Sequence, residues 1–336
     1  MSKKTYQVLK VSLKNNSFFL ILFFFFNSSF ASDIPNLTKQ NDFALITNQE
    51  SNILDIINLT TLEKVSEIKL GNSPVGIVID QKKKKAYVTN PKDNNITEIN
   101  FIQKTKELIP AGKNPLGIAL SKDKNHIFVT NWYDNLVSVI EVKSKKIIKK
   151  VKVGKNPAGI IVHRESGDII VCNRGSNNIM LIDSHKYIIK KTIDVEKSPF
   201  GVFFDDKEKR IFVTNVQSNS ISIINYDNLI LSKNIEVGKW PYHVALDGIN
   251  NKILISNQRE NSISVINSNN YEIYKKINEI CEYPEGININ NNKKIAIVAC
   301  WFSDEVVIID LLDYTVKKRI SASGGPRGFG NFILKN

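Results

Sequence analysis

The sequence predicts an all-β protein, a seven-bladed β-propeller of four-stranded antiparallel blades, and three observations support this. Within each repeat, four short apolar runs are separated by polar turns. The chain begins and ends in incomplete repeats that complement one another. The repeat itself is marked by seven prolines at steps of 41 to 43 residues: Pro74, Pro115, Pro157, Pro199, Pro241, Pro284 and Pro326. A fixed period of this length is typical of propellers and solenoids.

In each repeat the proline marks the start of the first strand, and a second strand follows after a turn. An apolar run such as 201–204 follows the proline, then a charged turn such as 205–209, then a second run that ends in Thr-Asn or a variant, as β-hairpins do. Proline has no amide hydrogen for a β-ladder, so we expect the first strand to be the inner edge of its blade. A glycine two residues after the proline lets backbones approach closely at the axis: Gly76, Gly117, Gly159, Gly201, Gly286 and Gly328.

The third and fourth strands follow in the same order. A third run such as 136–142 comes after about four polar residues, and a fourth run such as 147–153 carries several lysines. Charge on an edge strand discourages pairing with another molecule. The fourth strand is therefore expected to be the outer edge.

The two ends of the chain are expected to close the ring. Residues 323–336 supply a proline, a glycine and one apolar strand, whereas residues 41–70 begin at a second strand whose asparagine is Asn48. Together they make one complete blade. We therefore predict that N-terminal and C-terminal strands pair side by side, because an open solenoid would gain nothing from this match.

Three tetrapeptides carry a family resemblance: Tyr87-Val88-Thr89-Asn90, Phe128-Val129-Thr130-Asn131 and Phe212-Val213-Thr214-Asn215. With them, residues 41–336 resemble the YVTN β-propeller repeat proteins of the exported, YncE-like type. The resemblance implies a ring of seven four-stranded sheets. It implies no particular activity, because this fold carries many functions.

The first residues have the pattern of a secretory leader. Four lysines precede an apolar stretch at 18–26, and Ser29-Phe30-Ala31 offers the small residues that a signal peptidase reads. About nine apolar residues are too few for a membrane span, which needs about twenty. We predict a signal peptide at 1–31 cleaved after Ala31, a short linker at 32–40, and a periplasmic or secreted propeller at 41–336 without a membrane anchor.

The chain is basic. Its formal net charge is +13, and it falls to +9 without the four leader lysines. We expect the lysines of the remaining domain to be spread around the rim, on the outermost strands and turns. The alternative is weak binding to anionic partners such as acidic polymers. Aromatic residues are not interleaved with the lysines in the way that stacking on nucleic-acid bases requires.

Two of the three cysteines replace residues that the repeat keeps elsewhere. Cys281 stands at a glycine position and Cys300 at the asparagine position of the same repeat. An antiparallel hairpin brings these positions to the same end of the blade, and an exported protein permits disulfides. A Cys281–Cys300 disulfide is the resulting hypothesis, and Cys172 is expected to be a buried small apolar residue.

Departures from the repeat mark a candidate site. They fall in loops that share one face, and we expect several to surround the central opening: Trp132, Arg174, Trp240, Tyr242, His243, Tyr283, Glu285, Trp301 and Arg327. Aromatic walls with a few convergent polar groups describe a ligand pocket. The alternative is structural: Trp240, Tyr242 and Tyr283 plug the channel, and Glu285 and Arg327 form an ion pair.

These residues favour a binding or scaffold module for an unknown protein or small molecule. One alternative is a lactonase-like hydrolase, with His243 as base, Arg327 stabilising an oxyanion and Glu285 orienting either one. Another is a periplasmic accessory protein of a redox or quinone-dependent system. No cofactor or metal is predicted, because His126, His163, His185 and His243 occupy different phases of the repeat; we expect His163 to face solvent.

Overall fold

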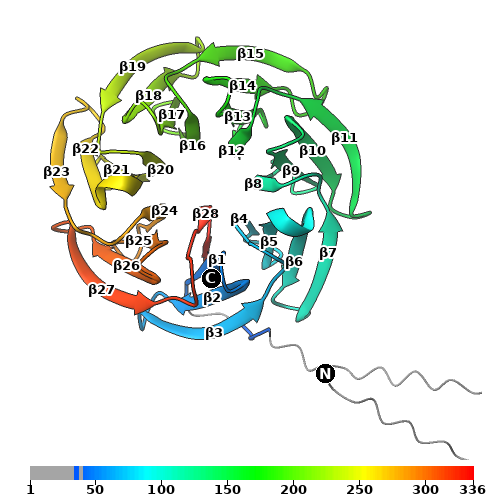
Figure 1. The fold of residues 1–336 in the computed structure, drawn as a ribbon, viewed down its shortest axis with the longest axis horizontal. Coiled ribbons are helices and arrows are strands. Elements are labelled where there is room, and N and C mark those ends of the chain that lie inside the picture. Colours follow the sequence, from blue (N-terminus) through cyan, green and yellow to red (C-terminus); the bar gives the residue numbers. More distant parts are fainter. Residues whose placement is uncertain (1–33, 38–40) are drawn as a thin grey trace, which may run out of the picture. The chain divides into compact units, whose positions relative to one another are not determined.

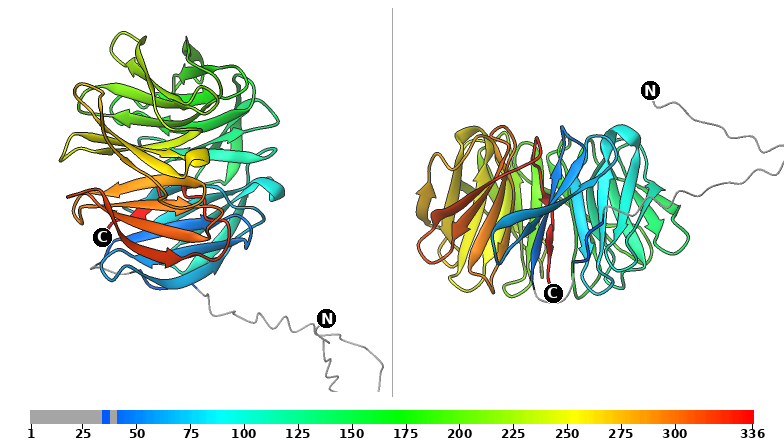
Figure 2. Two further views of the ribbon diagram at one scale, coloured as in Figure 1. Left: turned by 60° about the vertical axis from the view of Figure 1, so that its left-hand side comes forward. Right: turned by 90° about the horizontal axis from the view of Figure 1, so that it is seen from below.

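The computed structural model describes residues 34–37 and 41–336, and these form a closed ring of seven sheets around a central axis (Figure 1). Side views show the sheets standing around this axis in a thick disc (Figure 2). The predicted seven-bladed all-β fold is confirmed. The predicted signal peptide lies outside the described residues, and among those described no helix is long and apolar enough to cross a membrane.

Twenty-nine strands and two short 3-10 helices build the described part of the chain. In chain order they are β1 (Phe43–Asn48), β2 (Ile53–Asn58), β3 (Glu63–Lys69), β4 (Gly76–Asp80), β5 (Lys85–Asn90), η1 (Pro91–Asp93), β6 (Asn95–Asn100), β7 (Thr105–Pro110), β8 (Pro115–Leu120), β9 (His126–Asn131), β10 (Leu136–Glu141), β11 (Lys146–Lys152), β12 (Pro157–Val162), β13 (Ile169–Asn173), β14 (Asn178–Ile182), β15 (Ile189–Asp194), β16 (Pro199–Asp205), β17 (Arg210–Asn215), β18 (Ser220–Asn225), β19 (Ile230–Glu236), β20 (Pro241–Asp247), β21 (Lys252–Asn257), η2 (Gln258–Glu260), β22 (Ser262–Asn267), β23 (Ile273–Ile277), β24 (Pro284–Asn290), β25 (Ile295–Cys300), β26 (Glu305–Asp310), β27 (Thr315–Ser321), β28 (Phe329–Gly330) and β29 (Ile333–Leu334).

Consecutive strands pair antiparallel, with the first strand of each blade innermost and the fourth outermost (Figure 1). The closing blade has the order β29-β1-β2-β3, in which Phe43 pairs with Leu334 and Asn48 forms a bridge with Pro326. The predicted closure by the two chain ends is therefore confirmed. One feature was not predicted: the two-residue strand β28 leaves this blade and pairs parallel with β4 of the next.

The threonine of the repeated tetrapeptide joins neighbouring blades near the axis. The Thr89 hydroxyl accepts a hydrogen bond from the Gly76 amide at 2.8 Å and donates one to the Leu116 carbonyl of the next blade at 2.9 Å. Each such hydroxyl satisfies two buried backbone groups, which would be costly to leave unpaired. Cys172 and Ala299 occupy this position in two blades and bring no hydroxyl to it; Cys172 is fully buried, as expected.

The asparagine that follows ties the second strand to its surroundings. The Asn131 side-chain amide donates to the Ser138 hydroxyl on the third strand at 2.8 Å. In another blade the Asn173 side chain accepts a hydrogen bond from the Gly154 amide at 3.0 Å. Cys281 and Cys300 stand at the corresponding two positions and form a disulfide with their Cα atoms 6.0 Å apart. A covalent bond thus replaces the glycine–asparagine contact that four other blades make.

The glycine after the proline is required by contact between blades. A Cβ on Gly117 would come within 2.3 Å of the Ala158 carbonyl oxygen on the neighbouring inner strand. Real Cβ atoms do not approach backbone this closely, so a larger residue must displace one strand.

Apolar side chains between adjacent blades form the core, and two observations extend or correct the predictions. Ile34 and Leu37, within the predicted linker, are buried in the core cluster of the closing blade. His163 does not face solvent, as expected from the sequence, but is buried against the rings of Phe204 and Tyr226 at 4.3 and 4.4 Å. His163 directly follows β12, and Phe204 of β16 in the next blade covers its side chain together with Tyr226.

Candidate functional site

The residue after each proline points toward the axis, and these seven positions form what we term the inner ring. Its members are Val75, Leu116, Ala158, Phe200, Tyr242, Glu285 and Arg327. The apolar members pack with Phe329 into one buried cluster, in which the Phe200 ring lies 4.4 Å from Tyr242 and 5.1 Å from Phe329. Leu116, Phe200 and Tyr242 of this cluster also line the cavity described below, and we call the cluster its floor.

The residue after each second-strand asparagine, or after Cys300, forms a second ring toward the face where the first strands begin. Its members are Gln49, Pro91, Trp132, Arg174, Val216, Gln258 and Trp301. No residue type except tryptophan and glutamine occurs twice in this ring, although the residues just before it repeat from blade to blade. The inner ring, in which all seven residue types differ, and the second ring are therefore both positions at which the blades differ from one another.

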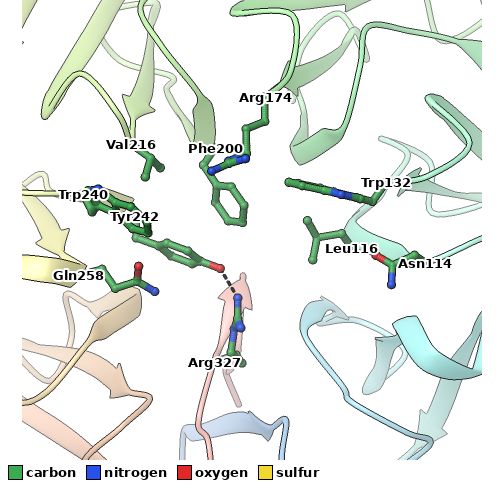
Figure 3. Close-up of a pocket in the computed structure, with 10 residues that line it drawn as sticks. All are labelled: Asn114, Leu116, Trp132, Arg174, Phe200, Val216, Trp240, Tyr242, Gln258 and Arg327. Atoms are coloured by element: carbon green, nitrogen blue, oxygen red, sulfur yellow. Dashed lines mark hydrogen bonds between the residues drawn. The ribbon is translucent and has the colours of Figure 1, made fainter.

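An open cavity of about 340 Å³ lies where the two rings meet, and we call it the funnel (Figure 3). This volume lies within the range of small-molecule sites. Its lining is Asn114, Leu116, Trp132, Arg174, Phe200, Val216, Trp240, Tyr242, Gln258 and Arg327. The predicted residues Trp132, Arg174, Trp240, Tyr242 and Arg327 thus line one cavity, whereas His243, Tyr283, Glu285 and Trp301 lie outside its lining.

A buried ion pair lies beneath one side of the funnel. Arg327 Nε is 2.5 Å from a carboxylate oxygen of Glu285, and the same guanidinium donates to Gln49 Oε1 at 2.8 Å and to the Tyr242 hydroxyl. The Gln258 amide donates to Glu285 at 2.6 Å. Burial raises the pKa of Glu285 to about 7, although Arg327 opposes this shift. The positive charge of Arg327 is therefore compensated from below.

His243 turns away from the funnel. It stands at a glycine position of the repeat, so its side chain enters the contact between β20 and β24, where Nδ1 lies 3.2 Å from the Ile287 carbonyl oxygen. Burial lowers the pKa of His243 to about 4. The imidazole is thus neutral at physiological pH and has no access to a ligand above the floor.

Arg174 has a different environment from Arg327. Its guanidinium lies 5.7 Å from the centre of the Trp132 ring, and Figure 3 shows it among the side chains that line the funnel. Among the described residues its side chain has no hydrogen bond and no ion pair. Arginine presents five N–H donors in a planar fork, so Arg174 retains its full capacity to bind a ligand.

Of the remaining predicted residues, Trp240 lines the funnel, whereas Tyr283 and Trp301 lie outside its lining. Trp240 and Tyr283 precede their prolines with φ values of 57° and 54°, a left-handed conformation that is uncommon for large side chains. The Arg259 guanidinium stacks 3.6 Å from the Trp240 ring centre. Tyr283 instead packs with Trp301 and with Phe302, which is 51% exposed.

Five lining residues were missed from the sequence: Asn114, Leu116, Phe200, Val216 and Gln258. Four of them occupy the same repeat positions as Tyr242 or Trp132, and Asn114 occupies that of Trp240. Taking every residue at those positions, rather than only the unusual ones, would have found them. Within the described residues, no three His, Cys, Asp or Glu side chains are grouped so as to hold a metal ion.

Comparisons with known proteins agree with this fold. A family model described as YNCE-like β-propeller matches residues 27–165 and 122–210. No curated protein sequence matches the chain.

Three solved structures illustrate the likeness. A functionally unknown protein from Desulfotomaculum acetoxidans has a TM-score of 0.72 at 16% identity, covering 85% of this chain and 98% of its own. Hydrazine synthase of Kuenenia stuttgartiensis has a TM-score of 0.66 at 17% identity, covering 75% and 87%. A putative 6-phosphogluconolactonase from Bacteroides uniformis has a TM-score of 0.71 at 15% identity, covering 85% and 98%. At these identities the likeness shows the fold alone.

Proposed function

Because the chain belongs to the YNCE-like β-propeller family, whose fold does not fix a chemistry, we propose that it is a binding module that takes a small ligand in the funnel. The observation that carries this proposal is the lining itself. Aromatic walls and an unpaired guanidinium converge on an open cavity of about 340 Å³. Buried apolar surface with a few orienting polar groups is the usual composition of a ligand site.

The variation around the ring supports binding over simple closure of the channel. The apolar residues of the floor, among them Phe200 and Tyr242, are already buried against one another. Trp132 and Arg174 lie above that floor and are only partly buried, so the ring does not need them for its core. Large apolar side chains that stay partly exposed around a cavity are typical of a binding site, because a ligand can bury them.

The hydrolytic alternative is not favoured by this geometry. A lactonase-like mechanism needs a base within hydrogen-bond reach of the substrate or its water. His243 instead contacts the Ile287 carbonyl and the Phe329 ring, and Glu285 is occupied by Arg327 and Gln258. The redox-accessory alternative likewise has no residue in the funnel that favours it, so we propose neither.

We also propose that the protein works outside the cytoplasm, after removal of residues 1–31. Support comes from the leader pattern and from the cysteine pair 281 and 300, which is compatible with an oxidising compartment. Intact-mass analysis of protein from a periplasmic fraction should give a chain that begins at Ser32. A full-length chain retained in the cytoplasm would contradict export.

The binding proposal has a direct assay because two of the three tryptophans of the chain, Trp132 and Trp240, line the funnel. A chemically diverse small-molecule library is screened by thermal shift, and each hit is titrated by intrinsic tryptophan fluorescence. A ligand that binds only the folded form raises the melting temperature. Hits should be lost in Trp132→Ala and kept in Lys149→Gln, which changes an exposed lysine on β11. Hits that Trp132→Ala leaves unchanged would place binding elsewhere and refute the proposal, as would a library without hits.

A further inference from the structure

We propose that the ligand of the funnel is a small flat acid, an aromatic or conjugated ring carrying one carboxylate, whose carboxylate is bound by Arg174. This inference rests on the proposed function and names the class of ligand. It follows from the charge inside the funnel, the charge at its mouth and the shape of its walls.

One guanidinium in the funnel is available and the other is not. Two Arg327 N–H donors are used by Gln49 and Tyr242, and its Nε lies 2.5 Å from the Glu285 carboxyl, which balances its charge above the Glu285 pKa of about 7. Arg174 has no such partner among the residues described. The lining therefore presents one uncompensated positive charge, which matches a singly charged anion better than a cation or a dianion.

The mouth of the funnel is positively charged as well. In four consecutive blades an exposed lysine stands two residues before the proline, on the loop that leads into the first strand: Lys113, Lys155, Lys197 and Lys239. None of the four forms an ion pair within the part of the chain that the structure describes. Asp134 and Glu260 lie near them and accept backbone hydrogen bonds from Lys113 and Lys239, which offsets part of this charge. Like charges around a cleft raise the local concentration of an anion and its rate of association.

The walls favour a flat body for the ligand. Figure 3 shows Trp132 on one side of the opening and Trp240 with Tyr242 on the other, with Phe200 between them. Aromatic rings pack well against other rings in offset or edge-to-face arrangements. Trp132 already has Arg174 stacked against it, so a ring beside Trp132 brings its carboxylate within reach of the guanidinium fork.

Three probes separate charge from shape. Naphthalene-2-carboxylate is the flat acid, naphthalene-2-carboxamide is its neutral counterpart, and cyclohexanecarboxylate is an acid without a flat ring. Each is titrated by calorimetry into the native protein and into Arg174→Gln, Trp132→Ala and Lys149→Gln. The last variant is the matched control, since it removes one exposed charge far from the funnel.

The native protein should bind the naphthalene acid at least about 10-fold more tightly than the amide, because hydrogen bonds to charged groups contribute more than neutral ones. Arg174→Gln should abolish that difference, Trp132→Ala should weaken both naphthalene compounds, and Lys149→Gln should change nothing. The saturated acid should bind more weakly than the flat one.

Other outcomes overturn the inference in distinguishable ways. Equal binding of acid and amide would refute the ligand class while leaving the funnel as a binding site. A preference for the acid that persists in Arg174→Gln but disappears at high salt would refute the role of Arg174. It would show that the lysines at the mouth attract anions of any shape, including anionic polymers. Absence of binding by all three probes would refute the flat acid, whereas hits of another class in the library screen would still uphold the proposed function.

Discussion

Replacing Arg327 with leucine should destabilise the propeller, and by more at high pH than at low pH. The substitution leaves the Glu285 carboxyl, which is 0% exposed, with only the Gln258 amide as a side-chain partner. Removing one partner of a buried ion pair costs about 3–5 kcal/mol when the remaining group stays charged. Loss of the contacts to Gln49 and Tyr242 is included in that figure.

The pH dependence follows from the pKa of Glu285. In the native protein burial raises this pKa from 4.5 to about 7, so the folded state holds the proton more tightly than the unfolded state. Stability is therefore lost as pH rises from about 4.5 through about 7, by up to about 3 kcal/mol at about 1.4 kcal/mol per pKa unit. Without Arg327, which opposes the shift, the pKa rises further and the loss extends to higher pH. At pH 5 the variant escapes most of the charge penalty because Glu285 is protonated.

The measurement is urea unfolding of native protein and Arg327→Leu at pH 5 and pH 8.5, followed by tryptophan fluorescence. We expect the two proteins to differ by about 1–2 kcal/mol at pH 5, from the lost hydrogen bonds, and by about 3–5 kcal/mol at pH 8.5. His243, whose pKa is lowered by burial to about 4, contributes equally to both proteins, so its effect cancels in the difference.

A second variant tests the assignment to Glu285. In Arg327→Leu with Glu285→Gln the buried group carries no charge at any pH, so this double variant should be more stable than Arg327→Leu at pH 8.5 and similar to it at pH 5. An equal loss for Arg327→Leu at both pH values, or no recovery in the double variant, would refute the reasoning.

Three further predictions concern the ring itself, each checked by urea unfolding. Replacing the disulfide with serines at 281 and 300 should cost about 3 kcal/mol for a loop closed over 19 residues. Cys281→Gly with Cys300→Asn should lose less stability than the serine variant, because it restores the glycine–asparagine contact of four other blades. Cys281→Ala with Cys300→Asn should lose more stability than the glycine variant, since a Cβ at the equivalent glycines comes within 2.7 Å of asparagine. Cys172→Thr should stabilise by about 1 kcal/mol by adding the blade-joining hydroxyl, and a neutral or unfavourable result would contradict that role. Gly117→Ala should destabilise by about 1–3 kcal/mol, and Gly248→Ala, with nothing within 4 Å, should not; equal effects would refute the close-contact argument.

The sequence carried enough information for the ring because each structural position occurs up to seven times. The proline, glycine, threonine and asparagine positions could be aligned across blades, and from that alignment the strand order and the closure by Asn48 and Pro326 followed. The pairing of Cys281 with Cys300 came from the same alignment, since both replace residues that face each other in the other blades. Alignment of the repeats therefore showed which residues belong to one structural position and which depart from it.

The direction of individual side chains was harder to predict. His243 was expected at the central opening because it departs from the glycine of the repeat. It follows Tyr242 in the strand, however, and consecutive residues of a strand point to opposite faces. The glycine that His243 replaces faces the neighbouring blade, so its imidazole lies between β20 and β24. His163 was placed in solvent because the end of a strand looked exposed, whereas Phe204 and Tyr226 of neighbouring elements cover it.

The residues that line the funnel differ from blade to blade. Aligning the repeats could therefore show where the funnel lies, but not its shape or its charge. An axial position contributes one side chain from each blade, and the cavity depends on which seven are large, small or charged. Phe200 and Leu116 of the floor line the funnel, whereas Ala158 is buried in the same cluster and does not. Arg327 forms an ion pair because Glu285 is its neighbour in the inner ring. Arg174 has no ion-pair partner in the second ring because its neighbours there, Trp132 and Val216, carry no charge. Under the proposed function, the order of residue types around the axis selects the ligand, and exchanging Arg174 with Val216 should move the proposed anion-binding group by one blade while the ring itself remains intact.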